Sequence, residues 1–270
     1  MTDSPRPLTT LDFLALKKAG RKIVSLTAYD ALAARILDES GVDLILVGDS
    51  VNQVVAGRPT TLSATLDQMI YHARAVQGAV HRALVVVDLP FLSYQVTPED
   101  AIRNAGRVLQ ETDAAAVKLE GGVTMAPTIR ALVERGIPVM GHIGLTPQSV
   151  HALGGYRVQG REVAAAERLL ADARAVEEAG AFAIVLELVP AALAARVTAA
   201  LSIPTVGIGA GAGCDGQVLV LPDMLGMNAG FRPKFLKRYA DLDGIMRAAV
   251  SAFADDVRNG QYPGPEHGFE

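Results

Sequence analysis

Short apolar runs alternate along the chain with longer stretches in which apolar and polar positions follow a helical period. Several of the short runs, such as LILVG, LVVVD and AIVLE, carry apolar residues on both faces. Runs of this kind are typical of strands in a parallel sheet that is buried on both sides. The pattern predicts strands at residues 23–27, 43–48, 83–88, 115–119, 138–142, 181–187, 204–208 and 217–221.

The stretches between these runs predict helices with recognisable ends. Thr97 is a good capping residue, Pro98 suits the first helical position, and the acids that follow suit the positive end of the helix dipole. Gly41 and Gly180 stand where a helix must end before the next strand. We expect helices at residues 30–40, 65–79, 98–112, 124–135, 161–179 and 191–201.

This order of elements favours an α/β fold, the (β/α)8 TIM barrel. A doubly wound open sheet is the alternative, although it usually needs fewer strands and often carries a dinucleotide fingerprint. No internal linker or strong repeat divides the sequence, so we expect one domain over residues 1–270. Residues from about 223 to 270 exceed one closing helix and predict a helical extension that packs on the barrel or on a neighbouring subunit.

Composition and charge exclude several classes of protein. The chain has 270 residues, 50% of them hydrophobic, but no apolar run reaches the roughly 18 residues that a membrane helix needs. Residues 1–7 lack the basic-then-apolar order of a secretory signal, so we expect a cytoplasmic protein without a membrane partner. A net charge of −4 argues against nucleic acid as a partner, and the single cysteine, Cys214, excludes an intramolecular disulfide.

Acidic residues end or follow several of the predicted strands. The active site of a TIM barrel lies at the carboxyl ends of its strands, and four acids fall there: Asp49, Asp88, Glu120 and Glu187. Packed together without a cation, these carboxylates would repel one another. Oxygen ligands without a His/Cys cluster favour Mg²⁺ over Zn²⁺, and two or three protein ligands suffice because Mg²⁺ keeps several waters.

A lysine and a histidine accompany these acids. Lys118 and Glu120 are two residues apart on one strand and therefore share a face. Lys118 is predicted to hold a substrate carboxylate or oxo group; the alternatives are a structural ion pair and a Schiff-base amine. Glu187 is predicted to be the general base, with a fourth metal ligand or a structural carboxylate as the alternative. His142 contacts either the substrate or metal-bound water, unless it is a structural histidine.

Three other features carry weaker signals. Asp43 and Asp113 precede their strands and are interpreted as helix caps or surface charges. The glycine-rich segment 207–213 is compatible with a phosphate cradle or with close approach of the backbone to a ligand. Cys214 has no base beside it in sequence, so we predict that it is not catalytic.

Several motifs, taken together, resemble the ketopantoate hydroxymethyltransferase family. Their order and spacing agree with that family from about Leu8 to the C-terminus, which is far more specific than any single motif. The motifs are LTAYD at 26–30, VGDS at 47–50, DLPF at 88–91, VKLEGG at 117–122, GHIGLTPQS at 141–149, GGYRVQG at 154–160, GIGAG at 207–211 and YPG at 262–264.

The resemblance implies a barrel of the phosphoenolpyruvate/pyruvate type and a defined reaction. A hydroxymethyl unit would pass from 5,10-methylenetetrahydrofolate to 3-methyl-2-oxobutanoate through a magnesium-stabilised enolate, which gives 2-dehydropantoate in pantothenate and coenzyme A biosynthesis. Family members form large homo-oligomers, often decamers, and act on small molecules. By position, the magnesium-site acids are Asp49, Asp88 and Glu120, and the proton acceptor is Glu187. The residues expected to contact substrate are Asp49, Ser50, Asp88, Lys118 and His142.

The sequence departs from the usual family pattern after Ser50. Asn52 and Gln53 stand where glycine-containing sequence is common, and Arg58 stands where histidine is common. These changes bear on folate contacts or loop closure, and residues 227–231 also differ from the usual form. A magnesium-dependent 2-oxo acid lyase is the alternative enzyme, although no Lys-Lys-Cys-Gly segment is present. A non-catalytic scaffold is the other alternative, and it predicts the loss of acids that are all retained.

Overall fold

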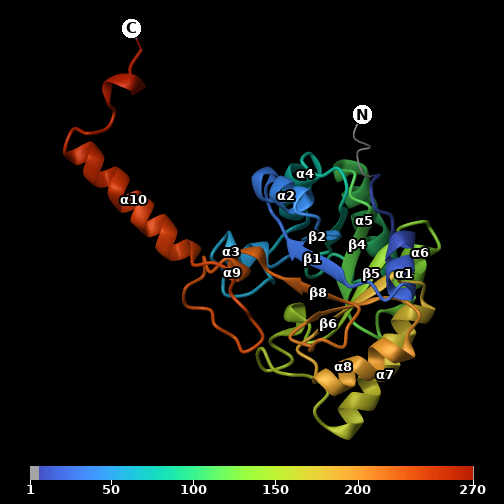
Figure 1. The fold of residues 1–270 in the computed structure, drawn as a ribbon. Helices are drawn as coiled ribbons and strands as arrows, with labels where there is room; N and C mark the ends of the chain where they lie inside the picture. The colour runs from blue at the N-terminus through green and yellow to red at the C-terminus, as the bar shows by residue number, and fades with distance from the viewer. Residues whose placement is uncertain (1–5, 270) are drawn as a thin grey trace. The chain divides into compact units, whose positions relative to one another are not determined.

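The computed structural model describes residues 6–269, so most of the polar N-terminal segment considered above lies outside the described residues. Within them, eight parallel strands form one closed barrel in chain order (Figure 1). The strands are β1 (Ile23–Thr27), β2 (Leu44–Val47), β3 (Leu84–Asp88), β4 (Ala116–Glu120), β5 (Val139–Gly144), β6 (Ala183–Glu187), β7 (Thr205–Ile208) and β8 (Gly216–Leu219).

Helices lie between the strands in sequence and outside them in Figure 1. They are α1 (Thr10–Lys18), α2 (Ala31–Glu39), α3 (Val51–Val54), α4 (Leu66–Gln77), α5 (Pro98–Thr112), α6 (Ala126–Val133), the 3-10 turn η1 (Pro147–Ser149), α7 (Val163–Glu178) and α8 (Ala191–Ala200). The TIM barrel is therefore confirmed, and every predicted strand and helix has a counterpart whose ends lie within two residues of the prediction. None of the helices in the described part of the chain is long and apolar enough to cross a membrane.

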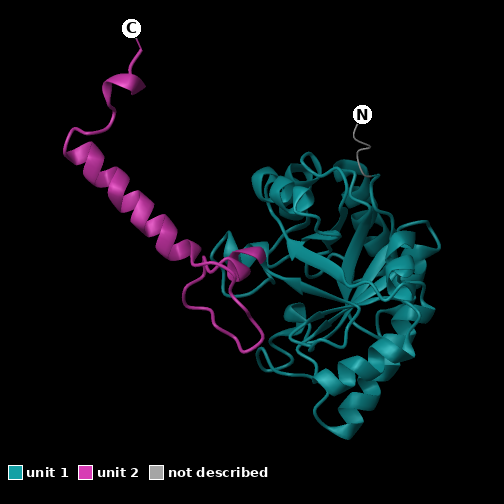
Figure 2. Ribbon diagram, in the orientation of Figure 1, with its two compact units in different colours: residues 1–220 teal, residues 221–270 magenta. Residues whose placement is uncertain are grey.

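The chain divides into two compact units, residues 1–220 with the barrel and residues 221–270 (Figure 2). The second unit contains α9 (Leu221–Met224), α10 (Leu242–Arg258) and the 3-10 turn η2 (Pro265–His267). Within it, the rings of Phe253 and Tyr262 meet edge to face at 5.4 Å. The prediction that this extension packs on the barrel or on a neighbouring subunit stays a prediction.

The barrel interior is apolar at the start of the strands and polar at their ends. Inward-facing residues from all eight strands form one core cluster, and Phe13 and Leu16 of α1 belong to it. Phe13 packs edge to face on Phe182 just before β6, with the ring centres 6.0 Å apart. Because Cβ directions alternate along a strand, Ala116 in this core fixes the inward direction of Lys118 and Glu120 further along β4.

The interpretation of Asp43 as a helix cap or a surface charge is wrong. The residue is buried just before β2, where Oδ2 accepts a hydrogen bond from the backbone N–H of Val24 at 3.1 Å. Its Oδ1 pairs with Arg82 at 2.8 Å and lies 3.7 Å from Arg21. Two arginines that reach Asp43 from other segments make its burial tolerable. The residues next to Asp43 in sequence give no sign of these partners.

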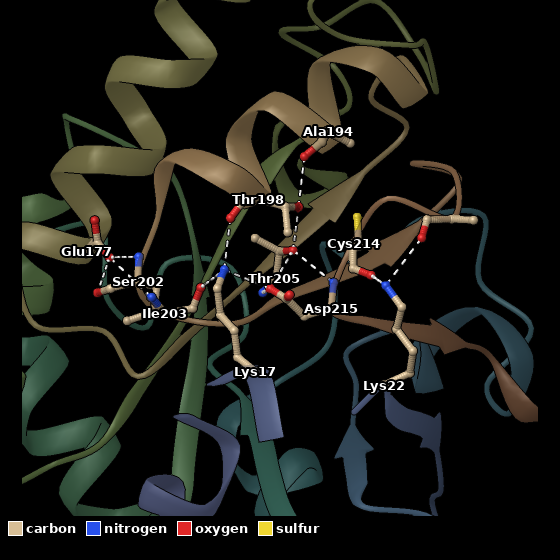
Figure 3. A network of polar contacts seen from close by, with 11 residues as sticks. Lys17, Lys22, Glu177, Ala194, Thr198, Ser202, Ile203, Thr205, Cys214 and Asp215 are labelled. Carbon is tan, nitrogen blue, oxygen red and sulfur yellow. Dashed lines mark hydrogen bonds and ion pairs between the residues drawn. The ribbon is translucent and has the colours of Figure 1, made fainter. Parts of the chain in front are cut away.

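A polar network ties α1 to the seventh and eighth strands (Figure 3). Lys17 Nζ donates to Asp215 Oδ2 at 2.9 Å and to the backbone carbonyls of Thr198 and Ile203 at 2.9 and 3.0 Å. Asp215 Oδ2 also accepts from the backbone N–H of Thr205 at 2.8 Å. All three donors of the ammonium group are therefore used, and the ammonium group is largely removed from solvent.

Replacing Lys17 by methionine should lower the free energy of unfolding by about 1–3 kcal/mol, because three partly buried acceptors lose their donor. Lys18→Met at the exposed neighbouring position is the matched control and should change it by less than about 0.5 kcal/mol. Urea unfolding followed by circular dichroism measures both. Equal stabilities for the two variants would show that the network does not hold α1 in place.

Candidate active site

The carboxyl ends of β2 to β6 bring the predicted polar residues into the barrel mouth. Asp49 comes two residues after β2, while Asp88, Glu120 and Glu187 are the last residues of β3, β4 and β6. His142 lies on β5 and pairs with Glu120 in the register of the two strands. Buried residues include Asp49, Asp88, Lys118, Glu120 and His142, whereas 18% of the Glu187 side chain is exposed.

Lys118 lies between two predicted site residues. Its Nζ pairs with Asp88 Oδ1 at 2.9 Å and lies 3.2 Å from Nδ1 of His142. Burial alone would lower the pKa of Lys118, but Asp88, Glu120 and Asp49 together raise it above its usual value. The side chain is therefore a stable cation, and a charged ammonium group does not suit the Schiff-base alternative.

The acids carry more negative charge than Lys118 can balance. Burial, followed by the charge of Asp88, raises the pKa of Asp49 to about 7. Burial likewise raises the pKa of Glu187 to about 7, and burial together with Asp49 raises the pKa of Glu120 well above its usual range. A cation brought among these oxygens would relieve both their mutual repulsion and the cost of their burial.

His142 is neutral in this setting. Burial and the adjacent charge of Lys118 lower its pKa well below the usual value. Since an ammonium group only donates, His142 Nδ1 must be the acceptor in the contact with Lys118, which assigns the ring proton to Nε2. This Nε2 is buried without a hydrogen-bond partner and lies 3.3 Å from Glu187 Oε2. The imidazole therefore presents an N–H donor beside Glu187.

Gln148 is a buried member of the site to which the sequence reasoning gave no role. Its Nε2 donates to Asp49 Oδ2 at 3.0 Å, and its backbone N–H donates to Glu120 Oε2 at 3.0 Å. Its Oε1 accepts from Tyr94 Oη at 2.8 Å. Its place in η1, four residues after the end of β5, was the one available signal, because a loop at that end of a barrel strand faces the mouth.

Ser50 is held by Tyr29, which belongs to the LTAYD motif but was not predicted from the sequence to have a role in the site. The two hydroxyl oxygens lie 2.8 Å apart. Gly48 makes this approach possible, because a Cβ there would lie 2.8 Å from Ser50 Oγ and 3.5 Å from Asp88 Oδ2. The turn after β2 is thus packed against the acids, and Ser50 stands directly beside Asp49 in the chain.

The backbone at Glu187 is fixed by close packing. Gly144 on the neighbouring strand has φ +93°, and a Cβ there would lie 2.3 Å from the carbonyl oxygen of Glu187. Leu188, directly after Glu187, has φ 46°, in the left-handed region that a leucine rarely occupies. Its N–H donates to Ile208 and its carbonyl accepts from Gln159. These two hydrogen bonds hold the strained backbone of Leu188, which fixes the direction in which the Glu187 side chain points.

The donor set suits a hard divalent cation, although no cage stands ready. Among residues 6–269, no three or more Asp, Glu, His or Cys side chains are arranged around a common point to hold an ion. Instead, the backbone N–H of Asp49 donates to Asp88 Oδ2 at 3.0 Å, while Lys118 and Gln148 take other carboxylate oxygens. Buried oxygens with unbalanced negative charge are nevertheless the ligands that Mg²⁺ prefers.

The departures at Asn52 and Gln53 have clear structural partners. Asn52 is buried and donates to the carbonyl of Thr60 at 2.7 Å and to Ser63 Oγ at 2.9 Å, which orders the loop after α3. Gln53 donates to Tyr156 Oη at 3.1 Å and so joins α3 to the segment after β5. The backbone N–H of Arg58 donates to Asn52, whereas its side chain is not among the site contacts.

A closed parallel barrel whose strand ends collect buried acids, a charged lysine and a neutral histidine defines a TIM-barrel enzyme with its site at the usual end. Residues 7–265 match the family model described as ketopantoate hydroxymethyltransferase. A 3-methyl-2-oxobutanoate hydroxymethyltransferase of Prosthecochloris aestuarii is 55% identical over 266 residues, which cover 97% of this chain and 96% of that protein. The chain belongs to the ketopantoate hydroxymethyltransferase family, so it is an enzyme of the transferase class.

Solved structures with low sequence identity share the fold. A phosphonopyruvate hydrolase in complex with oxalate and Mg²⁺ is 15% identical, with a TM-score of 0.60 over 94% of this chain and 88% of that one. A 2,3-dimethylmalate lyase, described as a member of the PEP mutase/isocitrate lyase superfamily, is 19% identical, with a TM-score of 0.60 over 97% and 89%. These structures confirm the barrel fold, family membership confirms the transferase class, and the lyase and scaffold alternatives lose their support.

Proposed function

We propose that the chain transfers a hydroxymethyl group from 5,10-methylenetetrahydrofolate to 3-methyl-2-oxobutanoate and forms 2-dehydropantoate in pantothenate and coenzyme A biosynthesis. Family membership supports the reaction class. The observation that carries the chemistry is the buried excess of carboxylates around Lys118 and His142. The proposal retains the cytoplasmic location predicted from the sequence.

We further propose that Asp49, Asp88 and Glu120 hold Mg²⁺ in this site. The first two are linked directly, since the backbone N–H of Asp49 donates to Asp88, and Gln148 joins Asp49 to Glu120. When bound, the cation supplies Lewis-acid stabilisation of an enolate. Support for this metal comes from the oxygen donors of the site and from the Mg²⁺ complex with oxalate in a protein of the same fold.

The remaining side chains have separable roles. We propose that the charge of Lys118 binds the carboxylate or oxo oxygen of a 2-oxo acid. Asp49 and Asp88 are proposed to contact the same substrate. Ser50 is proposed to orient the substrate through its hydroxyl group, which Tyr29 fixes. His142 offers its Nε2 proton to a substrate oxygen, because that atom has no other hydrogen-bond partner.

Glu187 is proposed to remove the proton from C3 of the oxo acid. Burial raises its pKa to about 7, close to the value at which a general base combines basicity with availability at neutral pH. The resulting enolate carbon attacks the one-carbon unit of the folate, a carbon–carbon bond forms, and water supplies the hydroxyl group as tetrahydrofolate leaves. The hydrogen bond between Gln53 of α3 and Tyr156 joins the segments that follow β2 and β5, and this link would limit the access of water to the mouth.

The C-terminal unit supports a homo-oligomer, and a decamer is the form that the family resemblance favours. Helix α10 has no buried residue, and Met246, Val250, Phe253 and Val257 form a single apolar stripe along it. Exposed apolar stripes of this length are typical of contact surfaces. We propose that a second copy of the chain covers this stripe.

Purified protein incubated with Mg²⁺, 3-methyl-2-oxobutanoate and 5,10-methylenetetrahydrofolate should form 2-dehydropantoate, detected by mass spectrometry. Treatment with EDTA should remove the activity, and added Mg²⁺ should restore it, because the acids cannot stabilise the enolate without a cation. Undiminished activity after complete metal removal would contradict the metal centre. If no product forms but the C3 proton exchanges in deuterated water in a metal-dependent way, the enolate chemistry would be supported. The electrophile would then be a compound other than the folate.

Glu187→Gln should lower kcat by about 10²- to 10⁴-fold, since the amide keeps the size of the side chain but cannot accept the C3 proton. Glu167→Gln is the matched control, because Glu167 lies exposed on α7 and pairs only with exposed Arg196. Steady-state kinetics at saturating substrate and Mg²⁺ measure both. Full activity of Glu187→Gln would show that another group is the base.

Phe253→Glu should shift the protein to smaller species in sedimentation velocity, because a charge in the apolar stripe must then be buried between copies. Ala248→Glu, on the opposite face of the same helix, should leave the assembly unchanged. A monomeric wild type at micromolar concentration, or an oligomer that Phe253→Glu does not disturb, would contradict the proposed contact.

A further inference from the structure

The side-chain amide of Gln148 is fully used within the barrel mouth. Its Nε2 donates to Asp49 Oδ2 at 3.0 Å and to the carbonyl of Leu89 at 2.9 Å. Its Oε1 accepts from Tyr94 Oη at 2.8 Å and from Gln95 Nε2 at 2.9 Å. Two donors and two acceptor positions are all that a primary amide offers, so every hydrogen-bonding position of this buried group is filled.

These contacts fix which way the amide faces. If its oxygen and nitrogen were exchanged, Oε1 would face the Asp49 carboxylate and the Leu89 carbonyl, which are both acceptors. The nitrogen would then face Gln95 Nε2, which is a donor. A reversed amide would therefore lose several buried hydrogen bonds at once, and the observed orientation is locked.

Gln148 also reaches a second acid through its main chain. Its backbone N–H donates to Glu120 Oε2 at 3.0 Å, and Tyr94 Oη accepts from the backbone N–H of Glu120 at 3.0 Å. Gln148 thus holds two acids that come from the ends of β2 and β4. It also contacts the carbonyl of Leu89, the residue directly after Asp88.

We propose that Gln148 is a positioning residue that orients Asp49 and Glu120 for cation binding, an inference that rests on the proposed magnesium site. The hydrogen bond to Oδ2 fixes the rotation of the Asp49 carboxylate and engages one of its two oxygens. The backbone bond does the same for Oε2 of Glu120. Outer-sphere partners that orient ligands in this way typically account for 10- to 100-fold in metal affinity or activity.

A Gln148 side chain that competes with the cation for Asp49, and does not orient it, would have the opposite effect on metal affinity. If the amide nitrogen competed with the cation for Asp49, removing it would tighten metal binding, whereas loss of an orienting partner weakens it. The direction of the change in affinity therefore separates the two roles. A purely structural role would lower thermal stability without changing the affinity of the folded protein for a cation.

The test is a titration of the full-length protein with Mn²⁺, followed through the electron paramagnetic resonance signal of the free ion. Gln148→Met keeps the length of the side chain and the backbone N–H to Glu120 but removes the amide, and it should raise the Mn²⁺ dissociation constant 10- to 100-fold. Its Mg²⁺ activation constant should rise in parallel, with a smaller loss of kcat at saturating Mg²⁺. Gln110→Met, on the exposed face of α5, should match the wild type.

Tyr94→Phe keeps Gln148 but removes one hydrogen bond that orients its amide and one that holds the backbone of Glu120. It should weaken Mn²⁺ binding at least about fivefold, the size expected if one of these two lost hydrogen bonds acts on the metal ligands, and it decides the question if Gln148→Met does not fold. Unchanged or tighter Mn²⁺ binding in a folded Gln148→Met, or unchanged binding in Tyr94→Phe, would overturn the positioning role alone. Failure of the wild type to bind Mn²⁺ would overturn the magnesium site, and this inference with it.

Discussion

The constraint on which the site depends is buried negative charge that one lysine cannot balance. Asp49, Asp88 and Glu120 lie in the barrel mouth, and Lys118 pairs directly with only one of them. Burying carboxylates is costly unless a positive charge and hydrogen-bond donors accompany them. In the proposed function, a divalent cation that also binds the 2-oxo acid would meet this need, and the same cation would then activate the substrate.

The barrel makes this charge cluster possible by separating apolar packing from polar chemistry along each strand. Residues near the strand starts form the core, and α1 adds Phe13 and Leu16 to it. The polar side chains leave the same strands a few residues later, in a register that places Glu120 beside His142. Well-packed strands hold such groups more firmly than loops do, which preserves the geometry that a charged site requires.

The sequence was sufficient to predict the barrel, its element boundaries and the convergence of the mouth acids, because period and strand ends carry that information. Gln148 and Tyr29 were not assigned roles, since a loop glutamine and a strand-end tyrosine acquire their importance from partners distant in sequence. The same limit explains the wrong interpretation of Asp43, whose partner Arg82 comes from another segment. The short helix α1 was not predicted, because its apolar residues are spread around the helix and give no clear helical period, unlike those of α2, which has the same length.

The most direct test of the central claim is the position of a bound cation. Crystals of the protein soaked with Mn²⁺ and 3-methyl-2-oxobutanoate can be measured near the manganese absorption edge, where the ion gives a strong anomalous difference peak. We predict one peak per chain within coordination distance of Asp49, Asp88 and Glu120, about 2.1 Å from their oxygens, with the oxo oxygen and one carboxylate oxygen of the acid on the ion. A peak elsewhere, or an oxo acid bound to Lys118 without an ion, would contradict it.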